Sequence, residues 1–146
     1  MSMQSPTKPT GRLITKGMQP ALQGVIPAVL ATCAADGTPN ATFISQVFYV
    51  DDHHVALSWQ FMNKTWRNLQ ENPRATVVIL CPGTFSMWKL KLRFLEQQTE
   101  GPVFDQMDMQ LMAIASMYHA GTSLTIKAAL VCEVLDVEVL HDGYNR

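Results

Sequence analysis

Short segments in which apolar and polar residues alternate constrain the fold of this chain more than any other feature of its sequence. Residues 55–61 alternate strictly, and residues 87–95 do so again. A period of two residues is typical of a β-strand, because successive side chains point to opposite faces of a sheet. The sequence therefore predicts a mainly β protein.

Turn residues divide the predicted strands into hairpins. Asp36-Gly37 is a hairpin turn signal, since both residues tolerate a positive φ. Connections this short require antiparallel neighbours, because parallel strands need long crossovers. The continuous apolar run at 75–81 is typical of a strand buried on both faces. The expected strands lie at residues 28–35, 40–50, 55–61, 75–81, 87–95 and 124–140.

Three helices are expected between these strands. The first spans residues 18–23, and the second spans 64–71 with Asn63 as its N-cap. The third begins at Gly101-Pro102 and ends at Gly121. Few alternating strands with short connections favour a closed or nearly closed barrel, which leaves few exposed sheet edges. We expect one domain at residues 18–141, with tails at 1–17 and 142–146.

Charge and cysteine content exclude several classes of function. The net charge of −1 gives no reason to expect binding to nucleic acid or to a membrane surface. No apolar run approaches the roughly 20 residues of a membrane span, and the first 16 residues lack the pattern of a signal peptide. The three cysteines lie in apolar stretches without a C-x-x-C pair, which favours reduced thiols in the cytoplasm.

The segment 58–74 carries the strongest indication of chemistry. It is expected to form a strand, a sharp turn and a helix start, and a helix N-terminus can bind a phosphate group. Lys64 and Arg67 add positive charge at the end where a cation is unfavourable to the helix itself. A capped surface helix with two solvated cations explains the same residues equally well.

Other polar clusters have simpler explanations. Three cations that share one strand face, Lys89, Lys91 and Arg93, form either an anion-binding surface or, as we favour, a solvated face that discourages edge pairing. His53 and His54 point to opposite faces and are expected to be exposed rather than to bind a metal. His119 lies near the end of the third helix, where a cation is favourable. The sequence has no P-loop and no Ser-His-Asp spacing, so we predict no catalytic side chain and no metal site.

The order of three motifs resembles a known family over about residues 20 to 140. Asp36-Gly37-Thr38-Pro39 precedes a strand, Asn63-Lys64 opens a helix, and Glu71-Asn72-Pro73-Arg74 ends that helix before a Val/Ile strand. This order resembles the pyridoxamine 5′-phosphate oxidase-like, FMN-binding split-barrel family. The resemblance implies a six-stranded antiparallel split β-barrel of Greek-key type. It also implies a homodimer with two FMN sites where the subunits meet.

The resemblance further implies which residues bind the cofactor. Lys64 matches the second member of the family's basic phosphate-binding pair, whereas Asn63 stands where an Arg is usual. Arg67 or a basic residue of the other subunit would replace the missing charge. The isoalloxazine ring would lie along the preceding strands, at Phe43, Ile44, Ser45, Ser58, Trp59 and Gln60. Ser58 and Gln60 would offer hydrogen bonds to a ring edge, unless they are simply exposed, and Trp59 alternates with core residues.

Flavin chemistry needs no catalytic side chain, because hydride is taken at N5 of the ring. We therefore expect an FMN-dependent oxidoreductase that acts on a small substrate at the dimer groove, with NAD(P)H as a candidate electron donor. A true pyridoxamine phosphate oxidase is less favoured, since the chain ends without that group's Arg/His segment. The open alternatives are a non-catalytic sensing or storage module and a barrel that binds haem or a deazaflavin.

Overall fold

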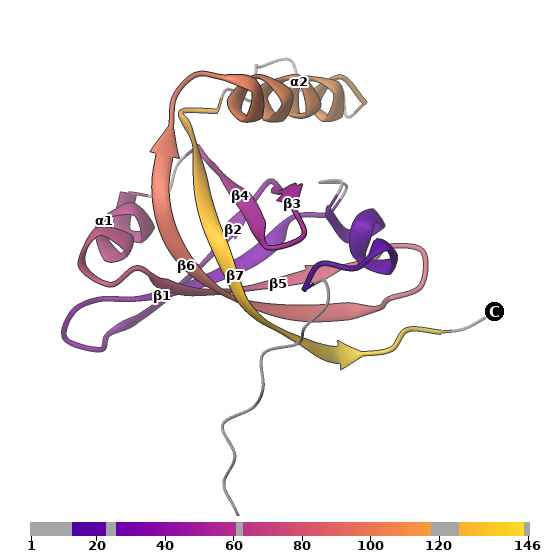
Figure 1. Ribbon diagram of the computed structural model, residues 1–146, viewed down its shortest axis with the longest axis horizontal. Helices are drawn as coiled ribbons and strands as arrows, with labels where there is room; N and C mark the ends of the chain where they lie inside the picture. Colours follow the sequence, from indigo (N-terminus) through magenta and orange to yellow (C-terminus); the bar gives the residue numbers. More distant parts are fainter. Residues whose placement is uncertain (1–12, 23–25, 61–62, 118–125, 145–146) are drawn as a thin grey trace, which may run out of the picture.

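The computed structural model describes residues 13–22, 26–60, 63–117 and 126–144, which form a mainly β barrel with short helices around it (Figure 1). The elements in chain order are η1 (Lys16–Leu22), β1 (Ala28–Cys33), β2 (Pro39–Ile44), β3 (Val47–Asp51), β4 (His54–Trp59), α1 (Asn63–Glu71), β5 (Arg74–Leu80), β6 (Met87–Gln98), α2 (Pro102–Met117) and β7 (Ala128–His141).

All the strands belong to one antiparallel sheet in the order β2-β1-β5-β6-β7-β4-β3. The two longest strands, β6 and β7, bend round the barrel (Figure 1). Their pairing shifts register at several points, and an extra residue in one strand bends and twists a ladder. This curvature brings β2 into contact with β4. The predicted antiparallel barrel is confirmed.

The strand expected at residues 40–50 is in fact two strands, so the sheet has seven strands instead of six. β2 pairs with β1 at one end of the sheet, whereas β3 pairs with β4 at the other end. The chain passes between these ends at Ser45 and Gln46, where the Ser58 N–H donates to the Gln46 carbonyl at 3.2 Å. The prediction missed this corner because the strand-forming composition continues through it.

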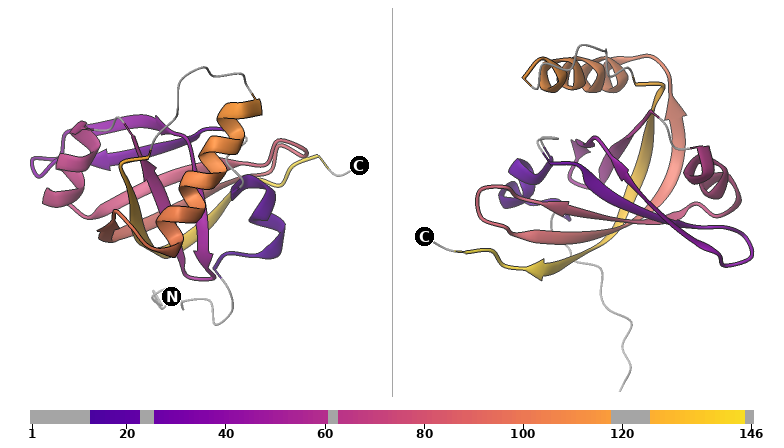
Figure 2. Two further views of the ribbon diagram at one scale, coloured as in Figure 1. Left: turned by 90° about the horizontal axis from the view of Figure 1, so that it is seen from above. Right: turned by 180° about the vertical axis from the view of Figure 1, so that it is seen from behind.

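Hydrophobic side chains cover both faces of β4. Val55 and Leu57 point into the main core inside the barrel. Ala56 points the other way and packs with Met107 and Leu111 of α2. Figure 2 shows α2 crossing the strands when the molecule is seen from above. Alternation thus identified the strand, but it did not reveal that a helix covers the second face.

Two of the three helices begin within one residue of the predicted positions, whereas η1 begins at Lys16, two residues before the predicted start. α1 starts at Asn63 and ends at Glu71, directly before Asn72. α2 starts at Pro102, after Gly101 with a φ of 104°. Gly121, the predicted end of this helix, lies outside the described residues.

β5 departs from the prediction that both of its faces are buried. Ala75, Val77 and Ile79 lie in the core, but the alternate residues Thr76 and Val78 are only half-buried. Their side of the sheet faces outward, whereas η1, which contacts β5, packs with the core residues on the other side. An apolar composition therefore did not mean a buried strand here.

The folded part starts earlier than the predicted boundary at residue 18. Ile14 is buried in the main core, and η1 begins at Lys16. The residues from 13 onward therefore pack with the barrel. Within the described ranges, no helix is long and apolar enough to cross a membrane.

Candidate functional site

A cavity of about 190 Å³ lies between the β1–β2 hairpin and one side of α1, along the length of that helix. Lys64 and Arg67 line it, and both side chains are exposed. Two hydrogen bonds fix α1 against the hairpin: Asn40 Nδ2 donates to Thr65 Oγ1 at 3.0 Å, and Asn68 Nδ2 donates to Thr32 Oγ1 at 3.1 Å. The positions of the two cations thus follow from buried contacts of the same helix.

The electrostatics of this cavity favour an anion. The first turn of α1 contains no acidic residue, so the partial positive charge of the helix N-terminus is not offset there. Neither Lys64 nor Arg67 forms an ion pair with any described residue. The one carboxylate in the lining, Glu71, lies at the far end of the helix and accepts a hydrogen bond from the Ala35 N–H at 3.1 Å.

A cluster of polar side chains, of which Gln46, Ser58 and Gln60 are buried, lies at the corner between β2 and β3. Ser45 Oγ donates to Gln60 Oε1 at 2.5 Å, and Gln46 Nε2 donates to Gln110 Oε1 of α2. Ser58 Oγ accepts a hydrogen bond from the Gln46 N–H at 3.0 Å. The cluster thus links the barrel corner, the end of β4 and α2.

Three buried polar atoms in this region have no hydrogen-bond partner among the described residues: Gln46 Oε1, Gln60 Nε2 and Trp59 Nε1. Gln46 is 1% exposed and Gln60 is 6% exposed. An unsatisfied buried group costs about 1–3 kcal/mol, so native structures rarely retain one without a reason.

The sequence left open that Ser58 and Gln60 are simply exposed to solvent, and their burial excludes this explanation. Ser58 is 1% exposed, so neither it nor Gln60 is a simple solvent-facing side chain. The Ser58 hydroxyl is already bonded to the Gln46 backbone, whereas the Gln60 amide keeps a donor without a partner.

Trp59 packs within an aromatic group at the end of β4. Its ring stacks on Trp66 of α1 with centroids 4.7 Å apart, and Trp66 meets Phe94 edge-on at 5.7 Å. Lys127 Nζ lies 5.9 Å from the centroid of the Trp59 ring. These contacts tie the start of α1 to the barrel, so Trp59 has a packing role.

The nine predicted binding residues do not gather at one point. Asn63, Lys64 and Arg67 lie on α1, and Ser45, Ser58 and Gln60 lie at the corner. Ile44 is buried in the main core, whereas its neighbour Phe43 is 73% exposed on the outer face of β2. Sequence reasoning missed Gln46 and Gln110; the signal for Gln46 was an amide inside an apolar run.

The other polar clusters behave as surface groups. On β6, Lys89 pairs with Glu138 and Arg93 pairs with Glu133, each at 3.3 Å, so these two cations are already neutralised by β7.

His53 is exposed and His54 is half-buried, and both follow the acidic pair Asp51-Asp52 in the turn between β3 and β4. Although partial burial of the Asp51 carboxyl works against it, hydrogen bonds from the His53 N–H and the His54 ring hold the pKa of that carboxyl below its usual value. No cluster in the described residues could hold a metal ion, and His119 lies outside them.

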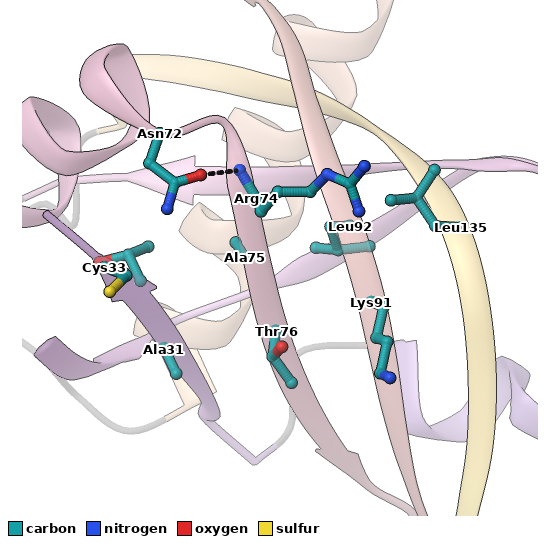
Figure 3. A pocket seen from close by; sticks show the side chains of 10 residues that line it. Ala31, Cys33, Asn72, Arg74, Ala75, Thr76, Lys91, Leu92 and Leu135 are labelled. Carbon is teal, nitrogen blue, oxygen red and sulfur yellow. Dashed lines mark hydrogen bonds between the residues drawn. The ribbon is translucent and has the colours of Figure 1, made fainter. Parts of the chain in front are cut away.

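A second cavity, of about 310 Å³, lies on the outer face of the sheet at β1, β5 and β6 (Figure 3). No motif in the sequence predicts it, because its walls come from distant strands. Arg74 and Lys91 are its charged lining residues.

A family model described as pyridoxamine 5′-phosphate oxidase matches residues 14–139. The chain belongs to this family. The family resemblance expected from the order of the motifs is therefore confirmed, and the match includes both the β2–β3 corner and α1. No curated protein matches the chain significantly.

Solved structures share the fold of this member of the pyridoxamine 5′-phosphate oxidase family. An FMN-binding protein from Syntrophomonas wolfei subsp. wolfei is 18% identical, with a TM-score of 0.67 over 85% of this chain and 86% of that chain. An F420 reductase is 14% identical, with a TM-score of 0.62 over 86% and 98%. HutZ, a haem storage protein from Vibrio cholerae, is 15% identical, with a TM-score of 0.55 over 88% and 95%. At these identities the likeness shows a common fold.

FMN, the cofactor that the family implies, fits the groups found here. The cavity at α1 offers two cations and a helix N-terminus for a phosphate. The corner offers a donor in Gln60 and an acceptor in Gln46 that lack partners. The cavity at α1 thus suits the phosphate of a flavin mononucleotide, and the corner carries polar groups of the kind that hydrogen-bond to a flavin ring.

Proposed function

We propose that this chain binds FMN and acts as a flavin-dependent oxidoreductase on a small substrate. The observation that carries the proposal is the pair Lys64 and Arg67, which line the cavity beside α1 and form no ion pair with a described residue. Lys64 lies in the first turn of the helix, where the helix dipole also favours a phosphate group. Membership of the pyridoxamine 5′-phosphate oxidase family supports the same ligand.

In this proposal, the side chains of the corner orient the flavin ring. Gln60 Nε2 donates to a ring acceptor, and Gln46 Oε1 accepts from a ring N–H. Ser45 and Gln110 hold these two amides in place through their own hydrogen bonds. FMN when bound supplies a ring that accepts hydride, while the protein supplies its position and surroundings.

We also propose that the protein is a homodimer that completes the site. Phe43, Val29 and Val78 lie side by side across β2, β1 and β5 on the outward face. Phe43 is 73% exposed and Val29 is 37% exposed, and an apolar row of this kind favours association. A basic residue of the second subunit would replace the charge that Asn63 lacks. The three free thiols favour the cytoplasm as its compartment.

The visible spectrum of the purified protein tests the cofactor. The protein is incubated with FMN, separated from free flavin and scanned. Flavin bands in the protein fraction support the proposal. A Soret band from retained haem, or retention of F420 in place of FMN, contradicts it, as does a protein that retains no chromophore.

Bleaching under anaerobic conditions tests the oxidoreductase activity. Loss of the flavin bands on addition of NADH or NADPH, followed by their return with an added electron acceptor, supports turnover. Bound FMN that neither nucleotide reduces would instead favour a sensing or storage role and refute NAD(P)H as the donor.

A further inference from the structure

The helix α2 exposes three methionines on its solvent side. Met109, Met112 and Met117 are 65%, 59% and 68% exposed, whereas Met107 and Leu111 are fully buried against the barrel. Methionine is among the residue types most often buried, and a helix that packs on a core usually carries polar residues on its opposite face. Packing of α2 on the barrel therefore does not account for the exposed methionines.

Two of these methionines share one face of α2 with two acidic residues. Asp105 precedes Met109 by four residues, and Asp108 precedes Met112 by four, so the members of each pair lie one turn apart on the same face. Neither aspartate forms an ion pair with a described residue, and α2 contains no lysine or arginine. The helix dipole favours Asp105 in the first turn, but Asp108 lies beyond that turn. We call Asp105, Asp108, Met109 and Met112 the α2 outer face.

The α2 outer face points away from both surfaces that we assign to FMN and to the dimer. Gln110, which bonds to Gln46 at the barrel corner, lies about 160° around the helix axis from Met112. Figure 1 and the rear view in Figure 2 show α2 at one end of the molecule and β1 and β5 at the other. A dimer through the outward face of β1, β2 and β5 therefore does not cover the α2 outer face. If a second copy docked that outward face onto α2 instead, the subunits would join head to tail rather than as a two-fold dimer.

We propose that the α2 outer face docks an amphipathic helix of another protein, which carries lysine or arginine residues beside its apolar stripe. Methionine side chains adapt to varied apolar surfaces, and Met109 and Met112, at i and i+3, match the spacing of apolar anchors on a docked helix. The two unpaired carboxylates complement basic residues and so determine the sign of the partner's charge. They also disfavour an anionic membrane surface, which attracts basic segments instead.

A synthetic amphipathic peptide of leucine and lysine serves as the probe. Leucine forms one face of its helix and lysine the rest, and the anisotropy of a fluorescent label reports its binding to the whole chain. We expect saturable binding that weakens as the salt concentration rises, because exposed charges are screened. A matched peptide with glutamate in place of lysine should bind far more weakly. The affinity should be the same with and without FMN, so this outcome does not depend on flavin binding.

Substitutions assign the binding to the α2 outer face. Met109→Gln and Met112→Gln should each weaken the affinity for the lysine peptide about tenfold, as expected when about half of the apolar contact of a methionine is lost. Met117→Gln is the matched control, because Met117 is similarly exposed on the same helix but lies about 140° around the axis from Met112. Asp108→Asn should weaken binding about two- to fivefold at low salt. Asp142→Asn, at an exposed residue beside the β5–β6 connection, should leave it unchanged.

Four results would overturn the proposal: no saturable binding of the lysine peptide, equal binding of the glutamate peptide, an equal loss in Met117→Gln, or full binding by the Met109→Gln, Met112→Gln double variant. Light scattering after size-exclusion chromatography tests a second copy as the occupant. The double variant should keep the oligomeric state of the wild type, and a change of state would assign the α2 outer face to a second copy instead. Unchanged thermal melting would confirm that the variants fold.

Discussion

Replacing Lys64 by methionine should weaken the binding of FMN but leave the binding of riboflavin unchanged. Methionine keeps most of the apolar stem of lysine and removes only its charge, which we assign to the phosphate. Riboflavin lacks the phosphate, so it serves as the matched ligand. The comparison therefore separates the loss of a phosphate contact from general damage to the site.

The size of the effect follows from the exposure of Lys64. Two unit charges at about 4 Å interact with about 1 kcal/mol in bulk water and about 4 kcal/mol near a protein surface. Because Lys64 is exposed, the lower part of this range applies, and we expect a loss of about 1–2 kcal/mol. This corresponds to about a 5- to 30-fold increase in the Kd for FMN.

Quenching of flavin fluorescence measures both affinities. The titrations are run at low and at high salt, because screening should shrink the difference between wild type and variant for an exposed charge. Lys16→Met, a change at an exposed lysine of η1, is the control and should bind FMN normally. An unchanged FMN affinity in Lys64→Met, or an equal loss for riboflavin, would refute the assignment of the phosphate.

Three further predictions concern the ring, the fold and the thiols. Gln60→Met should weaken FMN and riboflavin alike, by about fivefold for one lost hydrogen bond; a loss confined to FMN would contradict the ring assignment. Leu111→Ala should lower the free energy of unfolding in urea by about 2–5 kcal/mol, whereas Met112→Ala, exposed on the same helix, should change it by less than about 0.5 kcal/mol; similar values would refute the packing of α2. Burial raises the pKa of the Cys132 thiol to about 12, so iodoacetamide should label Cys33 but not Cys132 in the native protein at pH 8, and rapid native labelling of Cys132 would contradict its burial. The raised pKa also favours the folded state fully below the usual value of 9.0 and progressively less as the pH rises toward about 12.

Local signals predicted those features that depend on neighbouring residues. Gly37, at the predicted hairpin turn, has a φ of 91°, a conformation that glycine adopts without steric cost. Asn63 and Asn72 bracketed α1 correctly, because helix ends are determined by the residues next to them. The alternation at 55–61 likewise located β4.

Features that depend on distant residues were not predictable in this way. The corner at Ser45 and Gln46 exists because β2 and β3 join opposite ends of the sheet, and both flanking segments favour strands. The burial of Ser58 and Gln60 arises at the barrel corner, where they form hydrogen bonds with Gln46 and Ser45. Val78 is only half-buried because its side of β5 faces outward, which the apolar composition of the strand does not encode.

The candidate site likewise contains residues that the sequence predicted and residues that it did not. Lys64 and Arg67 were found from the sequence, because a helix start and its charges are local. Gln46 and Gln110 were not found, because their hydrogen bond joins residues 64 positions apart. The cavity at Arg74 and Lys91 also escaped, since its lining comes from strands that become neighbours only in the folded sheet.

A crystal structure of the protein with FMN would show where the cofactor binds. We expect a phosphate within hydrogen-bond distance of Lys64 or Arg67 on α1, and a ring edge that contacts the Gln60 amide. A phosphate bound elsewhere, for example at Arg74, or a crystal soaked in excess FMN that contains no flavin, would contradict this prediction.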